Sequence, residues 1–176
     1  MASIDAIRDR VRLLIDDTDV ACQVFTNAEI ESALERRSDE ARYYPLEERE
    51  TIAPGGTVSY LTFDAPVGDW ETNVVLVNSS YQVLTPATSD PIIGRWTFST
   101  QPRYPVMITG TTYDIYGSAG DLLLQRATRE AASFDVSADG ISLSRSQKAE
   151  AYSAKAYSYL AKSRTMTTNL VRTDEC

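Results

Sequence analysis

The sequence predicts an α+β protein, in which the two ends of the chain form an antiparallel helical bundle and the middle forms a small inserted antiparallel β domain. Apolar residues recur at helical spacing near both ends of the 176-residue chain, whereas the centre alternates short apolar runs with turns. This length suits one domain that carries one small module. The predicted parts are N-terminal helices over residues 1–45, the β module over 46–112, C-terminal helices over 113–162 and an extended tail over 163–176.

The first helix is predicted to begin at Ser3, which can cap it, and to end at the acidic run 16–19. Acidic groups at the C-terminus of a helix oppose its macrodipole, so this run favours a stop. The apolar residues expected on its buried face are Ile4, Ile7, Val11 and Leu14.

A capping box from Thr26 to Glu29 predicts the start of a second helix, and Phe25 with Ile30 can form its hydrophobic staple. We expect this helix to fray between Arg37 and Tyr44, because the proline that follows disfavours helical backbone before it. A loop is therefore expected before the β module begins.

Strands become the expected element beyond residue 49. Only six charged residues fall within 51–110, a stretch rich in threonine, valine and aromatic residues and interrupted by turns. Several short strands separated by turns suggest a small sandwich or barrel. The expected strands are 58–63, 70–77, 81–85, 96–98 and 106–108.

Helical periodicity resumes near Tyr113. Gly117 and Gly120 lie in this stretch, and each glycine costs about 1 kcal/mol relative to alanine in a helix, so we expect another helix to approach closely there. A further capping box at 144–147 predicts the last helix, from about 145 to 162. Residues 163–176 have no helical period and are expected to be extended or disordered in the free protein.

The composition excludes most catalytic and metal chemistry. The chain has no histidine and only two cysteines, so histidine-based triads and zinc sites cannot form. Asp17 begins an acidic pattern similar to a calcium-binding loop, but the sequence has neither the glycine nor the distal glutamate of such a loop at the required spacing. Cys22 is interpreted as a small apolar residue. We therefore expect no enzyme, no metal and no cofactor.

The formal net charge is −8, and residues 1–50, with 7 basic and 13 acidic side chains, account for −6 of it. No basic stripe is visible, so a protein that grips nucleic acid is not predicted. No apolar run approaches the roughly 20 residues that span a bilayer. We interpret the acidic clusters as a solvated surface that repels DNA.

Two sets of segments carry a family resemblance. The first set is IRDRVRLLIDDTD (7–19) and FTNAEI (25–30), and the second is YGSAGDLLL (116–124), FDVSADG (134–140) and LSRSQKA (143–149). In this order they resemble segments of the head-to-tail adaptor (connector) proteins of long-tailed bacteriophages. The resemblance covers both helical regions and leaves out the β module.

The resemblance implies a structural protein of the virion neck, present in the host cytoplasm during assembly. Such a protein forms a homo-oligomeric ring, typically of twelve copies, beneath the portal protein. It extends the DNA channel, through which genomic DNA passes without sequence-specific binding, and it joins the head to stopper or tail proteins. No membrane partner is implied.

The resemblance also implies that the C-terminal segment contacts the portal. Carried onto this sequence, the portal-binding residues are Arg164, Thr165, Met166, Thr167, Thr168, Asn169, Leu170, Val171, Arg172 and Thr173. An acidic channel wall would let DNA slide without sticking. The candidate channel-lining acids are Asp39, Glu40, Glu47 and Glu48.

Two alternatives stay open at this point. The first is another neck component, a head-completion stopper or a tail terminator, although such proteins are usually dominated by β-barrels and both ends of this chain are predicted to be helical. The second is a glycan- or ligand-binding module that uses Trp70, Tyr81 and Trp96 as a platform. We prefer to place these three aromatic residues in the core of the β module.

Overall fold

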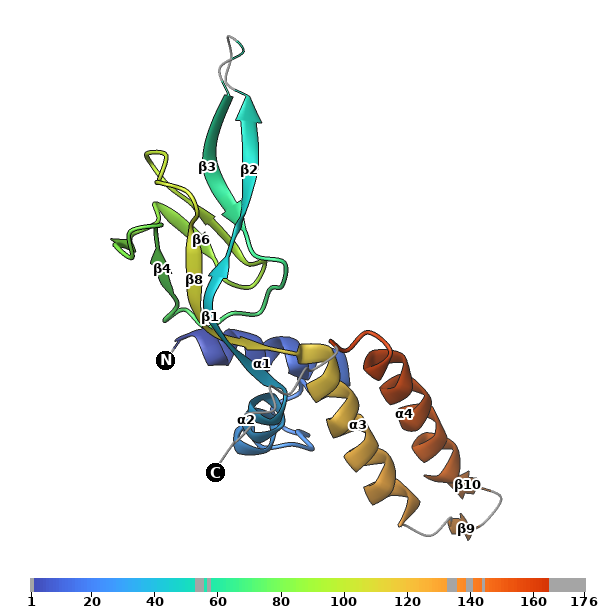
Figure 1. Cartoon of the computed structure of the whole chain (residues 1–176). Coiled ribbons are helices and arrows are strands. Elements are labelled where there is room, and N and C mark those ends of the chain that lie inside the picture. The colour runs from blue at the N-terminus through green and yellow to red at the C-terminus, as the bar shows by residue number, and fades with distance from the viewer. Residues whose placement is uncertain are drawn as a thin grey trace, which may run out of the picture.

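The computed structural model describes residues 2–52, 56, 58–132, 136–138, 141–143 and 145–164. These residues fold into helices and antiparallel sheets, so the mixed α and β architecture is confirmed (Figure 1). No described helix is long and apolar enough to cross a membrane. The helices are α1 (Ala2–Ile15), α2 (Asn27–Arg36), α3 (Ile115–Ala131) and α4 (Arg145–Leu160).

The strands between α2 and α3 form two four-stranded antiparallel sheets. Their bounds are β1 (Ser38–Pro45), β2 (Glu47–Ile52), β3 (Val58–Asp64), β4 (Val75–Val77), β5 (Val83–Leu84), β6 (Thr88–Asp90), β7 (Arg95–Thr97) and β8 (Met107–Tyr113). The sheet orders are β1-β8-β4-β5 and β2-β3-β7-β6. A short pair, β9 (Val136–Ala138) and β10 (Ile141–Leu143), lies at the far end of the α3–α4 hairpin (Figure 1).

The four helices share one hydrophobic core. α1 and α2 pack against α3, and α3 packs along α4. The predicted buried face of α1 is confirmed, because Ile7 and Val11 are fully buried and Ile4 and Leu14 pack partly buried against the same core. The other fully buried helical residues of this core are Ile15, Ile30, Ala33, Leu34, Ala119, Leu122, Leu123 and Ala156.

A second core lies within the β module. Trp70 and Trp96 are each 1% exposed, and their rings meet edge to face at 6.2 Å between centroids. Phe63 and Phe98 form a second edge-to-face pair beside them. The other buried members are Leu46, Leu76, Val106 and Ile108.

The N-terminal helices differ from the prediction at two ends. α1 begins at Ala2, one residue before the predicted start at Ser3. After α2 the chain forms strand β1 and not a frayed helix, with Ser38 opposite Tyr113 of β8. The partner strand lies far along the sequence, so local propensity could not indicate this pairing. Tyr43, with φ +52, marks the irregularity at which the register shifts.

Two other predictions for the helices are confirmed, whereas the capping box predicted at 144–147 begins at a residue outside the described part of the chain. The Glu29 N–H donates to Thr26 Oγ1 at 3.2 Å and the Thr26 N–H donates to Glu29 Oε2 at 2.7 Å, which is the predicted capping box. A Cβ on Gly120 would lie 2.7 Å from Leu160 Cγ of α4. The close approach of another helix at the glycine-rich start of α3 is therefore confirmed.

The predicted strands of the β module are found with different bounds. The expected strand 70–77 is reduced to β4, and Trp70 forms only an isolated bridge with Thr112. β2 and β6 were not expected, because their sequences are polar or charged. Both are edge strands, which tolerate such residues since one side faces solvent.

Candidate functional site

The end of the described chain is fixed at a junction between the helices and the β module. Ser163 Oγ and the Arg164 N–H both donate to Oδ2 of Asp114, the latter at 3.1 Å. Asp114 is 3% exposed and caps α3, because its Oδ1 accepts the Gly117 N–H at 3.0 Å. One buried carboxylate thus joins the start of α3 to the residues that follow α4.

The Arg164 guanidinium reaches across this junction to the β module. It donates to Thr112 Oγ1 and to the Gly68 carbonyl, each at 2.9 Å, and lies 3.8 Å from Asp69 Oδ2. The Thr112 hydroxyl in turn donates to the same Gly68 carbonyl at 2.7 Å. Arg164 therefore contacts a preformed turn and is not a free surface cation.

Burial and charge act in opposite directions on Arg164. Burial lowers the pKa of its guanidinium below the ordinary value, while the carboxylates of Asp114 and Asp39 raise it. Because arginine remains protonated in proteins, the side chain stays cationic here. The junction thus holds a cation among carboxylates.

The Gly68–Asp69 turn is held in a conformation that few residues adopt. Asp69 has φ +59, is 7% exposed and accepts a hydrogen bond from Arg10 of α1. A Cβ on Gly68 would collide with the carbonyl oxygen of Ile92, so this position requires glycine. The turn connects α1, the β module and Arg164 in one polar network, which we call the junction network.

Of the ten predicted portal-binding residues, only Arg164 is described. It lies in the junction network rather than free for a partner. Residues 165–173 lie outside the described part of the chain. The structure therefore shows where the portal-binding segment begins, and the portal contacts of residues 165–173 stay a prediction.

The four candidate channel-lining acids are exposed but do not form one patch. Asp39 and Glu40 lie on β1, and Glu47 and Glu48 lie on β2. Successive side chains of a strand point to opposite faces, so the members of each pair face apart. The two residues of β1 also have different electrostatic partners. Glu40 forms a salt bridge at 3.1 Å with Arg42, whereas the charge of Asp39 raises the pKa of Arg164.

The acidic run after α1 closes a loop. The Asp17 carboxylate accepts the Val24 N–H at 2.7 Å and the Arg12 guanidinium at 2.8 Å, and it is almost fully buried. Within the described residues no group of three or more potential ligands could hold a metal ion. Cys22, interpreted from the sequence as a small apolar residue, lies exposed in the same loop.

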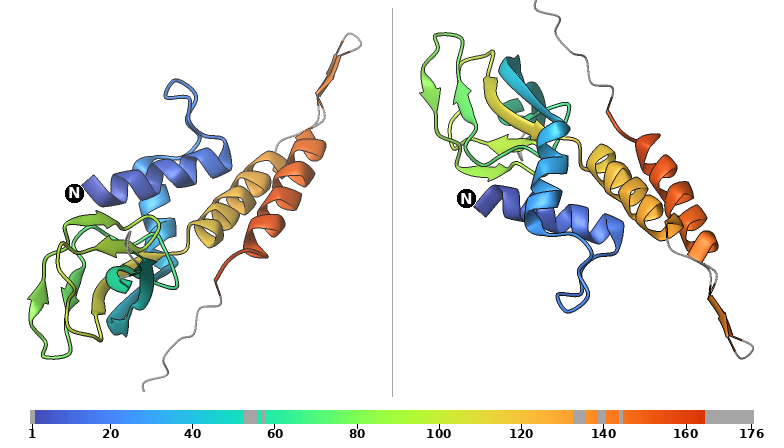
Figure 2. Two further views of the ribbon diagram at one scale, coloured as in Figure 1. Left: turned by 90° about the horizontal axis from the view of Figure 1, so that it is seen from above. Right: turned by 90° about the horizontal axis from the view of Figure 1, so that it is seen from below.

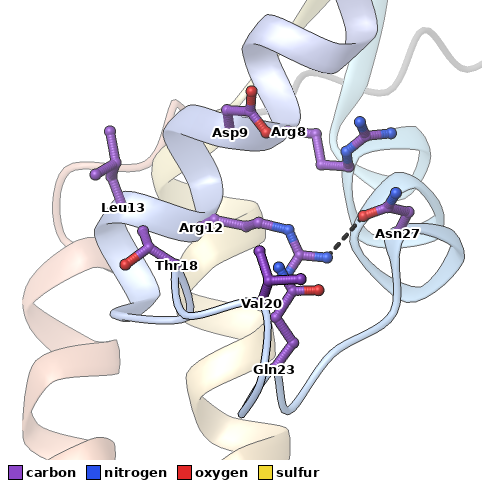
Figure 3. A pocket seen from close by; sticks show the side chains of 8 residues that line it. All are labelled: Arg8, Asp9, Arg12, Leu13, Thr18, Val20, Gln23 and Asn27. Carbon is purple, nitrogen blue, oxygen red and sulfur yellow. Dashed lines mark hydrogen bonds between the residues drawn. The ribbon is translucent and has the colours of Figure 1, made fainter.

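A cavity of about 550 Å³ lies between α1 and this loop (Figure 3). Leu13 and Val20 on its rim are 69% and 84% exposed, so it is an open groove. Figure 3 shows Arg12 directed at Asn27, and the two side chains join at 2.7 Å. Because Arg12 also donates to the Phe25 carbonyl at 3.1 Å, its hydrogen-bonding groups are engaged within the chain.

Two of the three residues named for the glycan platform are buried. Trp70 and Trp96 are 1% exposed, whereas Tyr81 is 66% exposed and contacts Tyr43 at the surface. A sugar platform needs accessible rings, and only one of the three residues offers one. The preferred assignment to the core is correct for the two tryptophans and wrong for Tyr81.

Sequence reasoning did not anticipate the junction network. A cap could have been inferred at Asp114, since an aspartate directly before a helical period is a common N-cap. The contacts of Gly68, Asp69 and Arg164 left no such signal, because they depend on how the helices and the β module meet.

The chain matches no family model, no curated protein and no solved structure.

Proposed function

We propose that this chain is a structural, non-enzymatic head-to-tail adaptor of a tailed phage or phage-like particle. It forms a ring beneath the portal, extends the DNA channel and joins the head to stopper or tail proteins. One observation carries the proposal. The resembling segments 7–19 and 25–30 lie far from 116–124 in sequence, yet the three supply α1, α2 and α3, which pack into one hydrophobic core.

The finer arrangement belongs to the same proposal. An antiparallel helical bundle carries a β module inserted between α2 and α3, and the module has its own core. Two separate groups of buried residues support this arrangement, one from the helices and their flanks and one from the strands and loops. The pairing of β1 with β8 favours module boundaries near Ser38 and Tyr113 over the predicted 46 and 112.

Residues 165–173 bind the portal in this proposal. The junction network supports it by giving that segment a defined starting point at Arg164. The exposed acids Asp39, Glu40, Glu47 and Glu48 lie in the channel wall or between neighbouring copies.

The test is to add the purified protein to DNA-filled heads that lack it and to image them by cryo-electron microscopy. We expect ring density at the portal vertex alone. Deleting 165–176 should abolish it, while Arg164 and its contacts remain intact and circular dichroism controls for folding. No density at saturating protein would overturn the proposal. A ring that forms only beneath another neck ring would indicate a stopper instead.

A further inference from the structure

All three lysines of the chain lie on one side of α4 and the turn that follows it. Lys148, Lys155 and Lys162 are spaced seven residues apart, which is about two helical turns, or about 10 Å. They form a basic stripe, although none was expected from the sequence. We call it the lysine stripe.

The lysine stripe has no acidic partner within the described chain. All ten ion pairs found among the described residues use arginine. The ammonium groups of Lys155 and Lys162 instead lie over the Tyr159 ring, at 5.8 and 5.9 Å from its centroid. Lys148 and Lys162 are exposed. The stripe is thus open to an anionic surface outside the chain.

The strand β2 offers such a surface. Glu47, Glu48 and Glu50 are exposed, and none has an ion-pair partner among the described residues, because Arg49 lies 3.7 Å from Asp64 instead. β2 is the edge strand of its sheet, so a partner that approaches edge-on meets acids from both faces.

The two surfaces cannot meet within one copy. The lysine stripe extends over about 21 Å of helix, whereas Glu47, Glu48 and Glu50 lie within about 10 Å at the start of β2, so the stripe is long enough to span all three acids. β2 rises at one end of the molecule and α4 projects at the other (Figure 1), and the two remain apart in the views from above and below (Figure 2).

We propose that the lysine stripe of one copy packs along the β2 edge of the next copy. Such a heterologous contact joins different surfaces of identical chains and closes a ring when repeated around an axis. It rests on the proposed function, whose ring requires contacts between neighbours. It places Glu47 and Glu48 between copies rather than in the channel wall. DNA is the less favoured occupant, since the chain carries a net charge of −8.

The experiment is carbodiimide cross-linking of rings assembled on heads, and of the concentrated free protein, from a mixture of isotope-labelled and unlabelled copies. Carbodiimide joins an amine directly to a carboxylate, and the three lysines are the only side-chain amines, so few products can form. We expect cross-links from the lysine stripe to Glu47, Glu48 or Glu50 of another copy. Rings without these cross-links overturn the interface and leave the function standing. Cross-links in solution without a ring at the portal support the interface and overturn the function.

Charge reversal gives an independent test. We expect Lys148→Glu/Lys155→Glu/Lys162→Glu and Glu47→Lys/Glu48→Lys/Glu50→Lys each to reduce cross-linking and ring occupancy about tenfold. Both triple changes in one chain should restore them, and this rescue separates lost contact from lost folding. Arg103→Glu and Asp9→Lys, at exposed sites elsewhere, are the matched controls. Normal rings from the lysine variant, with only the passage of DNA altered, would assign the stripe to DNA and overturn the proposal.

Discussion

Asp114 organises two chain segments with one carboxylate. Its Oδ1 caps α3, and its Oδ2 accepts from Ser163 and from the Arg164 N–H. A buried acceptor with several donors stabilises all of them together, and removing it leaves those donors unsatisfied. The roles of the two carboxylate oxygens can be tested separately by substitution, because asparagine keeps only one oxygen as a hydrogen-bond acceptor.

Asp114→Asn should keep the cap and weaken the contacts of Oδ2, at a cost of about 1 kcal/mol in the free energy of unfolding. Asp114→Ala should lose both, at about 2 to 3 kcal/mol. Urea unfolding measures the cost, and hydrogen exchange reports the site. The Arg164 amide should exchange faster in both variants, but the Gly117 amide only in Asp114→Ala. Unchanged protection of the Arg164 amide in Asp114→Asn would contradict this assignment.

Glu29 makes the stability of α2 dependent on pH. The backbone hydrogen bond from Thr26, followed by the hydrogen bond from Arg129, lowers the pKa of Glu29 to about 2. A lowered native pKa means that the stabilisation is complete above the unfolded-state pKa and is lost as the pH falls towards the native one. The wild type should therefore lose this contribution between about pH 4.5 and about pH 2. Urea unfolding across that range should show that the free energy of unfolding depends less on pH in Glu29→Gln than in the control Glu35→Gln. An equal pH dependence in the two variants would contradict this role of Glu29.

The α3–α4 hairpin depends on how closely its two helices approach. At Gly120 a Cβ would lie 2.7 Å from Leu160 Cγ and 3.3 Å from the Ala156 carbonyl oxygen. Helix propensity alone favours alanine at this position by about 1 kcal/mol, but overpacking a tight contact costs about 1 to 3 kcal/mol. The contact outweighs propensity because the backbone of α4 also limits the space.

Gly120→Ala should therefore lower the free energy of unfolding by about 1 kcal/mol, measured in urea by far-ultraviolet circular dichroism. Leu160→Ala removes the side chain that a Cβ at residue 120 would contact. In that background, Gly120→Ala should become neutral or stabilising. Gln125→Ala, at an exposed position of α3, is the control. Stabilisation by Gly120→Ala in the native background would show that the helices can move apart freely.

At the scale of the whole molecule, the two cores can be followed separately. Both tryptophans lie in the β core, so their fluorescence reports the module, whereas far-ultraviolet circular dichroism reports mainly the helices. Phe63→Ala and Leu122→Ala each remove a fully buried side chain, one from each core, at about 3 kcal/mol. We expect the first to shift the fluorescence transition more and the second the dichroism transition more. Equal shifts of both signals would show that the cores unfold as one unit.

The acids of β1 and β2 are expected to have different roles in the assembled ring. Because Asp39 and Glu40 face apart, only one of them can line the proposed channel, and Asp39→Asn/Glu40→Gln removes whichever it is; the double variant should slow the ejection of DNA from complete particles by reducing the repulsion along the channel wall. Glu47→Gln/Glu48→Gln should reduce ring occupancy on heads and leave the ejection from fully assembled particles unchanged. Cryo-electron microscopy measures occupancy, and dye release from labelled DNA measures ejection. Unchanged ejection after Asp39→Asn/Glu40→Gln would place those residues outside the channel.

Helical parts of this fold could be predicted wherever the signal lies within a few residues. The capping box at Thr26, the buried face of α1 and the tight contact at Gly120 depend on neighbours along the chain or on side-chain size, and all three are confirmed. β1 and β2 could not be predicted, because a strand is stabilised by hydrogen bonds to a partner that the local sequence does not contain.

The amino-acid order determined the helical periodicity, the lack of histidine chemistry and the uneven charge. The tertiary structure decided that Asp114 meets Arg164, that Asp39 and Glu40 face apart, and that the lysine stripe has no acidic partner among the described residues. The physical reason is the distance along the chain over which each interaction acts. Periodicity and caps act over one or two turns, whereas burial, ion pairing and edge exposure depend on which distant segments fold against one another.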